Sequence, residues 1–240
     1  MRRLIEPRPN NASLPDIPEG DRETIRSVKD YTMTSAERIH AVCEAARYIE
    51  ANNIPGAIVE CGVWRGGSMM ALARTLLSMN AGNRELFLFD TFDGMSSPDD
   101  NDVSLAGERA SELIEQHTKS ESDLFWCYAP LEAVKQAVLS TGYPEEKVNF
   151  VKGRVEETLP GAAPEQIALL RLDTDWYEST RHELETLYPR LVRGGVLILD
   201  DYGHWQGARK AVDEYIERNS LKLFLSRTDY TGRVAIKAFE

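Results

Sequence analysis

Apolar runs of strand length alternate with amphipathic stretches of helix length along most of the chain. Strands are predicted at 57–59, 86–89 and 148–151, and in the runs that close at Asp173 and at Asp200. Helices are predicted after residue 34, at 66–79, through much of 105–142, at 178–192 and at 205–219. Strands that alternate with helices predict a parallel sheet covered on both faces, which is a doubly wound α/β fold.

The two ends of the chain depart from this alternation. Residues 1–30 carry four prolines among polar residues and are expected to form an extended arm, which leaves 31–240 as one domain. Thr34-Ser35-Ala36-Glu37 fits a capping box that starts the first helix. Runs 221–225 and 234–237 are separated only by a short turn region, so they are expected to pair antiparallel. The predicted sheet is therefore seven-stranded and mostly parallel, with a C-terminal hairpin.

Acidic residues close two of the predicted strands. Asp173 follows one apolar run, and the pair Asp200-Asp201 follows the next. The carboxyl ends of parallel strands meet at one edge of the sheet, where open α/β sheets bind ligands. Three carboxylates gathered there would repel each other unless a cation lay between them, and hard oxygen ligands suit Mg²⁺. The alternative is that each aspartate caps the helix that follows it.

Bulk properties narrow the range of partners. The formal net charge of −11 argues against nucleic acid, because phosphate binding needs a basic surface. No apolar run approaches the roughly 20 residues that span a membrane, and the N-terminus lacks the apolar core of a secretory signal. The three cysteines are far apart and fit neither a disulfide framework nor a zinc site. We therefore expect a cytoplasmic protein that binds a small molecule.

A glycine-containing segment at 59–68 links the first strand to its helix. Its glycines allow a tight turn and a close approach of backbone to ligand, but they lack the G-x-G-x-x-G spacing of dinucleotide-binding proteins. A plain strand-to-helix turn is the alternative. Asp90 ends the second strand, where an acid can accept hydrogen bonds from both hydroxyls of a ribose. Glu60, one strand over, could meet an ammonium group, so the two acids suit S-adenosylmethionine better than a dinucleotide.

Several motifs occur in an order that resembles the macrocin O-methyltransferase family, the sugar methyltransferases of macrolide and related antibiotic pathways. They are Tyr-Thr-Met-Thr-Ser at 31–35, Val-Glu-Cys-Gly-Val-Trp-Arg-Gly-Gly-Ser at 59–68, Asp-Thr-Phe-Asp-Gly at 90–94, Leu-Asp-Thr-Asp-Trp-Tyr-Glu-Ser-Thr at 172–180, Gly-Gly-Val at 194–196 and Asp-Asp-Tyr at 200–202. The resemblance covers roughly residues 30–215. It implies a class I methyltransferase fold, S-adenosylmethionine, and a Mg²⁺ held by Asp173, Asp200 and Asp201.

The residues predicted to bind the cofactor come from these segments. They are Met33, Thr34, Ser35, Glu60, Gly62, Arg65, Gly67, Ser68, Asp90 and Thr91. The resemblance places the segment 33–35 against the cofactor. Arg65 is a candidate partner of the cofactor carboxylate, with a surface salt bridge as the alternative. The arm and the segment 95–145 match no family motif, so we expect them to form the acceptor side of the pocket, with 95–145 as a lid.

Methyl transfer from a sulfonium to an oxygen is an in-line displacement in which the acceptor hydroxyl needs activation. A bound Mg²⁺ can stabilise the developing alkoxide and fix its orientation. Asp173 is the first candidate for the general base, because it can touch both the metal and the reacting hydroxyl. His204 is the alternative base. Asp175 is expected to cap the helix that follows it.

The resulting hypothesis is an O-methyltransferase that uses S-adenosylmethionine and Mg²⁺ on a hydroxyl of a sugar or glycosylated small molecule, and that works as a homo-oligomer. A catechol-type enzyme would apply the same metal to a phenolic diol. A nicotinamide-dependent dehydrogenase would need the dinucleotide motif that is missing. A non-catalytic binding module with the same fold is the last alternative, and the acids at all three positions count against it.

Overall fold

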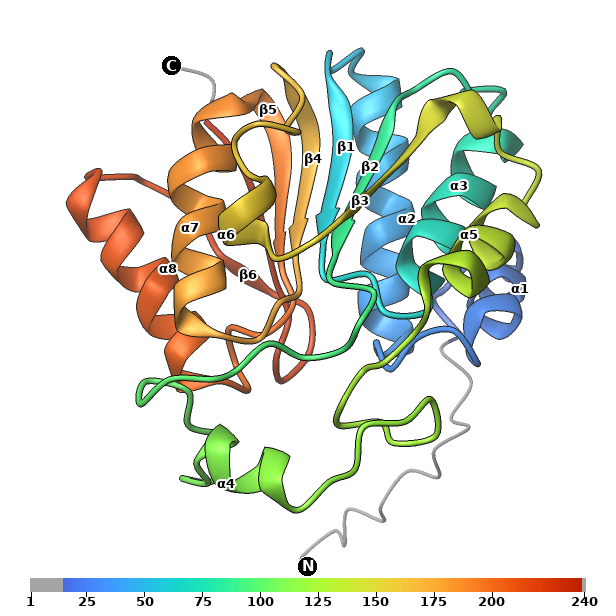
Figure 1. Cartoon of the computed structure of the whole chain (residues 1–240). Helices are drawn as coiled ribbons and strands as arrows, with labels where there is room; N and C mark the ends of the chain where they lie inside the picture. The colour runs from blue at the N-terminus through green and yellow to red at the C-terminus, as the bar shows by residue number, and fades with distance from the viewer. Residues whose placement is uncertain (1–14, 239–240) are drawn as a thin grey trace, which may run out of the picture.

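Seven strands form one sheet in the order β3-β2-β1-β4-β5-β7-β6 (Figure 1). The computed structural model describes residues 15–238. The strands are β1 (Ala57–Cys61), β2 (Leu86–Asp90), β3 (Val148–Lys152), β4 (Ile167–Leu172), β5 (Leu191–Leu199), β6 (Ser226–Arg227) and β7 (Arg233–Ile236). Strands β1 to β5 run parallel, whereas β7 is antiparallel to both β5 and β6. The predicted doubly wound sheet with a C-terminal antiparallel hairpin is confirmed.

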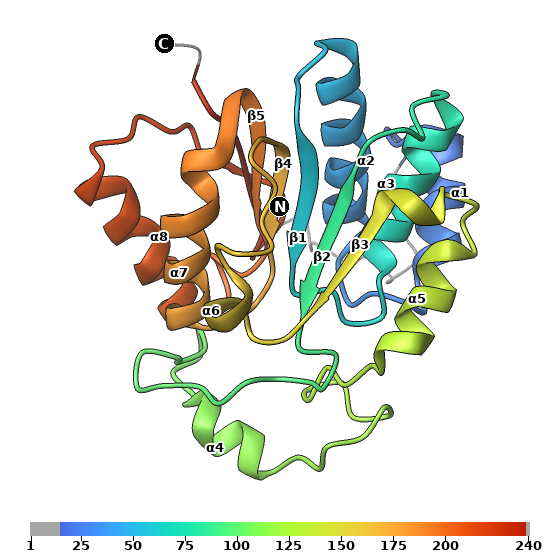
Figure 2. The same cartoon turned by 45° about the horizontal axis from the view of Figure 1, so that its top comes forward.

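Helices cover both faces of this sheet (Figures 1 and 2). One face carries α1 (Glu19–Val28), α2 (Ala36–Ala51), α3 (Gly67–Ser78) and α5 (Leu131–Leu139), and the other carries α6 (Val155–Thr158), α7 (Tyr177–Leu187) and α8 (Gln206–Arg218). Ile58 and Val59 point to opposite faces of β1, and each joins the core on its own side. Within residues 15–238, no helix is long and apolar enough to cross a membrane.

Helix α1 lies in the segment that its prolines predict to be extended. Acidic residues Glu19 and Asp21 occupy its first turn, where the helix dipole favours negative charge. The Asp21 carboxylate is buried against α2, where it accepts a hydrogen bond from Arg47 (2.9 Å) and lies 2.7 Å from His40 Nδ1. The expectation of an extended arm is therefore wrong for 19–28, and residues 1–14 lie outside the described residues.

Three other boundaries differ from the expected ones. Helix α2 is capped by Ser35 rather than Thr34, because the Ser35 hydroxyl accepts a hydrogen bond from the Arg38 amide (3.2 Å). Segment 105–142 is helical only in α4 (Ala110–Glu115) and in α5, which packs on α3. In the hairpin, β6 begins at Ser226, whereas leucines of the apolar run 221–225 pack on the core instead of pairing.

The loops after β1, β2, β4 and β5 gather at one edge of the sheet. Residues 95–129, which we call the cover segment, leave β2 and pass beneath this edge with α4 (Figures 1 and 2). The first part of the cover segment is tied to α7, because the buried Asp102 carboxylate accepts a hydrogen bond from the Tyr177 amide (2.8 Å). The Trp176 indole also donates to the Ser96 carbonyl (3.0 Å). The strand ends and the cover segment together enclose a site.

Candidate active site

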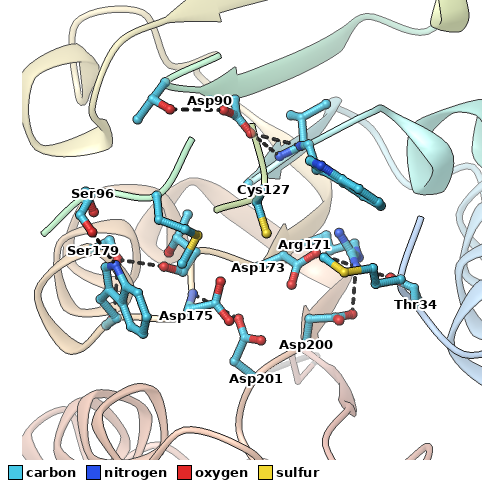
Figure 3. A pocket seen from close by; sticks show the side chains of 18 of the residues that line it. Thr34, Asp90, Ser96, Cys127, Arg171, Asp173, Asp175, Ser179, Asp200 and Asp201 are labelled. Atoms are coloured by element: carbon cyan, nitrogen blue, oxygen red, sulfur yellow. Dashed lines mark hydrogen bonds and ion pairs between the residues drawn. The ribbon is translucent and has the colours of Figure 1, made fainter. Parts of the chain in front are cut away.

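A cavity of about 370 Å³ lies between the strand ends and the cover segment. Its walls come from the loops after β1, β2, β4 and β5, from residues 31–34 between α1 and α2, and from the turn between β6 and β7. Asp90 lies at one side of this space and Asp173, Asp200 and Asp201 lie at the other, with Cys127 between them (Figure 3). The cavity therefore has two halves with different chemistry.

Asp90 organises the first half. One of its carboxylate oxygens accepts hydrogen bonds from the amides of Val63 (2.6 Å) and Trp64 (2.9 Å), and the other accepts from the Phe92 amide (2.7 Å). Burial raises the pKa of Asp90, and these amide hydrogen bonds oppose the rise. The carboxylate thus holds the loop after β1 in a fixed shape. Gly62 makes that shape possible, because it has φ of +82° and a Cβ there would collide with the Asp173 carbonyl.

The predicted cofactor residues separate into two groups. Those that line the cavity are Met33, Thr34, Gly62, Ser68, Asp90 and Thr91. The others, which do not line it, are Ser35, Glu60, Arg65 and Gly67. The Gly67 amide donates to the Tyr31 carbonyl (3.0 Å), and its missing side chain leaves room for residues 31–34 to cross the cavity wall. Arg65 donates to the backbone carbonyls of Asp30 and Glu121 and stacks on Trp64.

The second half of the cavity holds the acids that follow β4 and β5. One carboxylate oxygen from each of Asp173, Asp200 and Asp201 lies within 4.8 Å of the other two. The alternative that these aspartates cap helices is wrong, because the N-cap residues of α7 and α8 are Trp176 and Trp205, and the Tyr177 amide at the start of α7 donates to Asp102 instead. Asp200 Oδ1 is buried and accepts no hydrogen bond of good geometry from residues 15–238, although the Arg171 guanidinium forms an ion pair with it at 2.8 Å. Hard carboxylate oxygens with an unused lone pair fit Mg²⁺.

The acids raise each other's proton affinity. Burial, followed by repulsion from its neighbours, raises the pKa of Asp173 and of Asp201 well above the usual range, although Arg171 opposes the rise. Asp175 also lines the cavity instead of capping α7 as expected. Its carboxylate accepts a hydrogen bond from the Trp205 indole (2.7 Å), and burial together with Asp173 raises its pKa to about 7. The backbone of Asp175 has φ of +65°, in the left-handed region that non-glycine residues rarely adopt.

Two arginines that sequence reasoning missed lie among these acids. Arg171, on β4, contacts Asp173 and Asp200 (Figure 3), and it also pairs with Glu60. Arg38, on α2, pairs with Asp200 and with Asp229. A signal for Arg171 was present, since it is the one charged residue inside the apolar run that ends at Asp173. Glu60 stands opposite Arg171 in the β1–β4 register, so its carboxylate faces this arginine and not the cavity.

Aromatic and apolar side chains surround the acid half of the cavity. The rings of Trp176 and Trp205 pack edge to face beside the acids, with their centroids 4.9 Å apart. His204 lines the wall beside them, and its pKa is lowered by burial and by Arg38, so its imidazole is neutral at neutral pH. At the mouth, Met33, Leu124 and Tyr230 are between 48 % and 55 % exposed. An apolar rim of this kind suits a ligand that is partly apolar.

A family model for macrocin O-methyltransferases matches residues 19–236. The chain belongs to the macrocin O-methyltransferase family. One relative is the 8-demethyl-8-(2,3-dimethoxy-alpha-L-rhamnosyl)-tetracenomycin-C 4'-O-methyltransferase of Streptomyces olivaceus, 35 % identical over 84 % of this chain and 74 % of its own. Another is the demethyldecarbamoylnovobiocin O-methyltransferase of Streptomyces niveus, 32 % identical over 77 % of this chain and 67 % of its own. The protein is therefore an O-methyltransferase of natural-product type.

Solved structures agree with this family assignment. The O-methyltransferase NovP is 30 % identical, covers 87 % of this chain and 83 % of its own, and superposes with a TM-score of 0.76. The calicheamicin methyltransferase CalS11 is 18 % identical with a TM-score of 0.58 and shares the fold. The predicted class I methyltransferase fold is confirmed, and the dehydrogenase and the non-catalytic module are excluded as readings of this chain.

Proposed function

We propose that this methyltransferase moves a methyl group from S-adenosylmethionine to a hydroxyl of a sugar or glycosylated small molecule with the help of Mg²⁺. The observation that carries the proposal is that one cavity contains both the loop organised by Asp90 and the cluster of Asp173, Asp200 and Asp201. A methyl donor and a metal-bound acceptor need two such adjacent half-sites. The rhamnosyl group in the name of the Streptomyces olivaceus relative supports the acceptor class.

In the first half, Asp90 would accept hydrogen bonds from the ribose of the cofactor. Its Oδ1 receives one short hydrogen bond, from the Phe92 amide (2.7 Å), and a long one from the Thr91 hydroxyl (3.4 Å), which a ribose hydroxyl could replace. Met33, Thr34, Gly62, Ser68 and Thr91 would form the rest of the cofactor wall. Ser35, Gly67 and Arg65 would shape this wall from behind rather than touch the cofactor. Glu60 would serve the site through Arg171, since its carboxylate is occupied by that guanidinium.

In the second half, Asp173, Asp200 and Asp201 would hold Mg²⁺, which when bound offers its charge to the developing alkoxide. The protein must also take the proton of the acceptor hydroxyl. Asp173, the first candidate, pairs with Arg171, which makes it a weaker base. His204 lines the cavity in its neutral form and stays a candidate. Asp175 is a third candidate, since it contacts no arginine or lysine among the described residues and its pKa is near neutrality.

The apolar rim supports a glycoside with an apolar aglycone over a small free sugar. Leu124 comes from the cover segment, Met33 from the loop before α2, and Tyr230 from the β6–β7 turn. An aglycone bound among them would leave the sugar free to reach the acids below. A catechol could fit the metal but would leave most of this rim uncovered.

The decisive test is mass spectrometry of full-length enzyme with S-adenosylmethionine and Mg²⁺ against matched acceptors. The panel contains a rhamnosyl polyketide glycoside, the same aglycone without its sugar, and a simple catechol. We expect the mass of one methyl group to be added to the glycoside alone, on the sugar. Methylation of the free aglycone, or a catechol rate above the glycoside rate, would contradict the proposed acceptor class.

A further inference from the structure

Arg171 is a fully enclosed cation at the centre of the acid cluster. Its side chain is 3 % exposed. Nη1 donates to Glu60 Oε1 (2.7 Å), and Nη2 lies 2.8 Å from Asp173 Oδ2, 2.8 Å from Asp200 Oδ1 and 3.1 Å from Thr34 Oγ1. Burial alone would lower the pKa of Arg171, but the carboxylates of Asp173, Asp200 and Glu60 outweigh it and raise that pKa well above its usual value. The guanidinium therefore stays charged.

The local fold places the guanidinium there. Arg171 is the fifth residue of β4, directly opposite Glu60 in β1, so both side chains leave the same face of the sheet. Thr34, in the loop before α2, accepts a hydrogen bond from the Arg171 guanidinium on its remaining side. The planar guanidinium of an arginine can donate to several oxygens at once, whereas the ammonium of a lysine cannot reach them in the same geometry.

A second guanidinium reaches the cluster from the opposite direction. Arg38 Nη1 pairs with Asp200 Oδ2, while its Nε is fixed by Asp229 at 3.0 Å. Each oxygen of Asp200 therefore lies against an arginine, and so does one oxygen of Asp173. Asp201 has no arginine partner of this kind among the described residues and accepts a hydrogen bond from the Asp175 amide (3.1 Å). Two arginine charges thus face the three aspartates and two further carboxylates, Glu60 and Asp229, before any metal arrives.

We propose that Arg171 is a positioning residue that acts as a resident counter-ion: it holds Asp173 and Asp200 in place in the metal-free enzyme and weakens Mg²⁺ binding so that the ion can exchange. The proposal rests on the Mg²⁺ site proposed above. The guanidinium already contacts two of the three carboxylates that would hold Mg²⁺, so the ion's charge would be its near neighbour. Two positive charges at such a short separation repel each other strongly where water is excluded.

The test is calorimetric titration of MgCl₂ into metal-free full-length enzyme, at about pH 8.5, where protons compete least with the metal. Arg171→Met removes the charge but keeps a long apolar side chain, and we expect it to bind Mg²⁺ at least about tenfold more tightly than wild type. Arg171→Lys keeps the charge, and its affinity should stay within about threefold of wild type.

The matched control is Arg84→Met. Arg84 is also a mostly buried arginine with a carboxylate partner, Glu50, but it lies outside the cavity. Loss of this pair should lower the unfolding temperature without changing the affinity for Mg²⁺. Circular dichroism and unfolding midpoints establish that each variant is folded. If Arg171→Met does not fold, Arg38→Met carries the test with the same expected sign, because it also removes a charge from Asp200.

Each result has a defined meaning. Tighter Mg²⁺ binding by Arg171→Met, with Arg84→Met unchanged, supports the inference. Equal or weaker binding by folded Arg171→Met, or by folded Arg38→Met in its place, overturns it and leaves the Mg²⁺ site standing. Absence of Mg²⁺ binding to the wild type and to every variant overturns the metal site and this inference together.

Discussion

Because Glu183 is buried, we expect it to make the free energy of unfolding depend on pH. It lies on α7 behind the loop that carries Asp173 and Asp175, and its side chain is inaccessible to solvent. Thr174 Oγ1 donates to its Oε1 (3.0 Å), whereas Oε2 has no hydrogen-bond partner among the described residues. No arginine or lysine in residues 15–238 pairs with it. Burial therefore raises the pKa of Glu183 well above its usual value, which favours its neutral form in the folded protein.

The size of the effect follows from proton linkage. An unfolded glutamate ionises above about pH 4.3, so wild-type folding takes up a proton at this position between that pH and the raised folded-state pKa. Since the folded-state pKa is the raised one, wild-type stability falls as pH rises from the unfolded-state pKa to the folded-state pKa, by about 1.4 kcal/mol per pH unit. Glu183→Gln has the same shape and never needs the proton. Its gain over wild type should therefore be larger at about pH 6 than at about pH 4.5, by at most ~1.4 kcal/mol per pH unit.

Urea unfolding of the two proteins at both pH values measures this gain, and other titrating groups cancel in the comparison. Glu183→Ala is the control for packing, since it leaves a cavity and an unpaired Thr174 hydroxyl and should cost about 2–3 kcal/mol relative to Glu183→Gln. Glu183→Gln should keep its methyl-transfer rate, because the side chain does not reach the cavity. A stability difference between wild type and Glu183→Gln that is independent of pH would refute the neutral-acid assignment.

Three further outcomes test the site. Asp90→Ala should weaken binding of S-adenosylhomocysteine by about 1.5–3 kcal/mol, and calorimetry that finds unchanged affinity in a folded variant would remove Asp90 from the cofactor wall. Asp102→Ala removes the carboxylate that holds the cover segment to α7, so it should cost about 1–2 kcal/mol of stability and raise the KM for the acceptor more than that for the cofactor. Chelation should abolish turnover reversibly, and Asp201→Asn should need more Mg²⁺ for half-maximal rate; full activity after exhaustive chelation would contradict the metal role.

The architecture was predictable because each strand carries its own local signal. In β1 and β4 every residue is buried, because helices cover both faces of the sheet. Such strands can be recognised in the sequence as short apolar runs. The acids that follow β2, β4 and β5 could then be assigned to one edge by topology alone. Helix α1 was missed because its neighbouring prolines outweighed the acidic first turn at Glu19 and Asp21, although Val28 shows that it has a buried face.

What the sequence could not supply is register and the pairing of distant charges. Glu60 and Arg171 are 111 positions apart, and only the alignment of β1 with β4 makes them opposite neighbours. Without that pairing, Glu60 is most simply interpreted as a ligand for a cationic cofactor group. In the structure the Glu60 carboxylate instead pairs with the buried Arg171 guanidinium. The role of an acid at a strand end therefore depends on the residue that the neighbouring strand places beside it.

The same reasoning explains why a cluster of acids can exist in this fold before any ligand arrives. Desolvation and mutual repulsion raise the pKa of Asp173 and of Asp201 and so favour protonation, and a protonated acid is a poor metal ligand. Arg38 and Arg171 oppose that protonation from two sides, and each is itself fixed by a carboxylate outside the cluster, Asp229 for one and Glu60 for the other. The arginines therefore keep the acids ready for a metal while they also limit how tightly it is held.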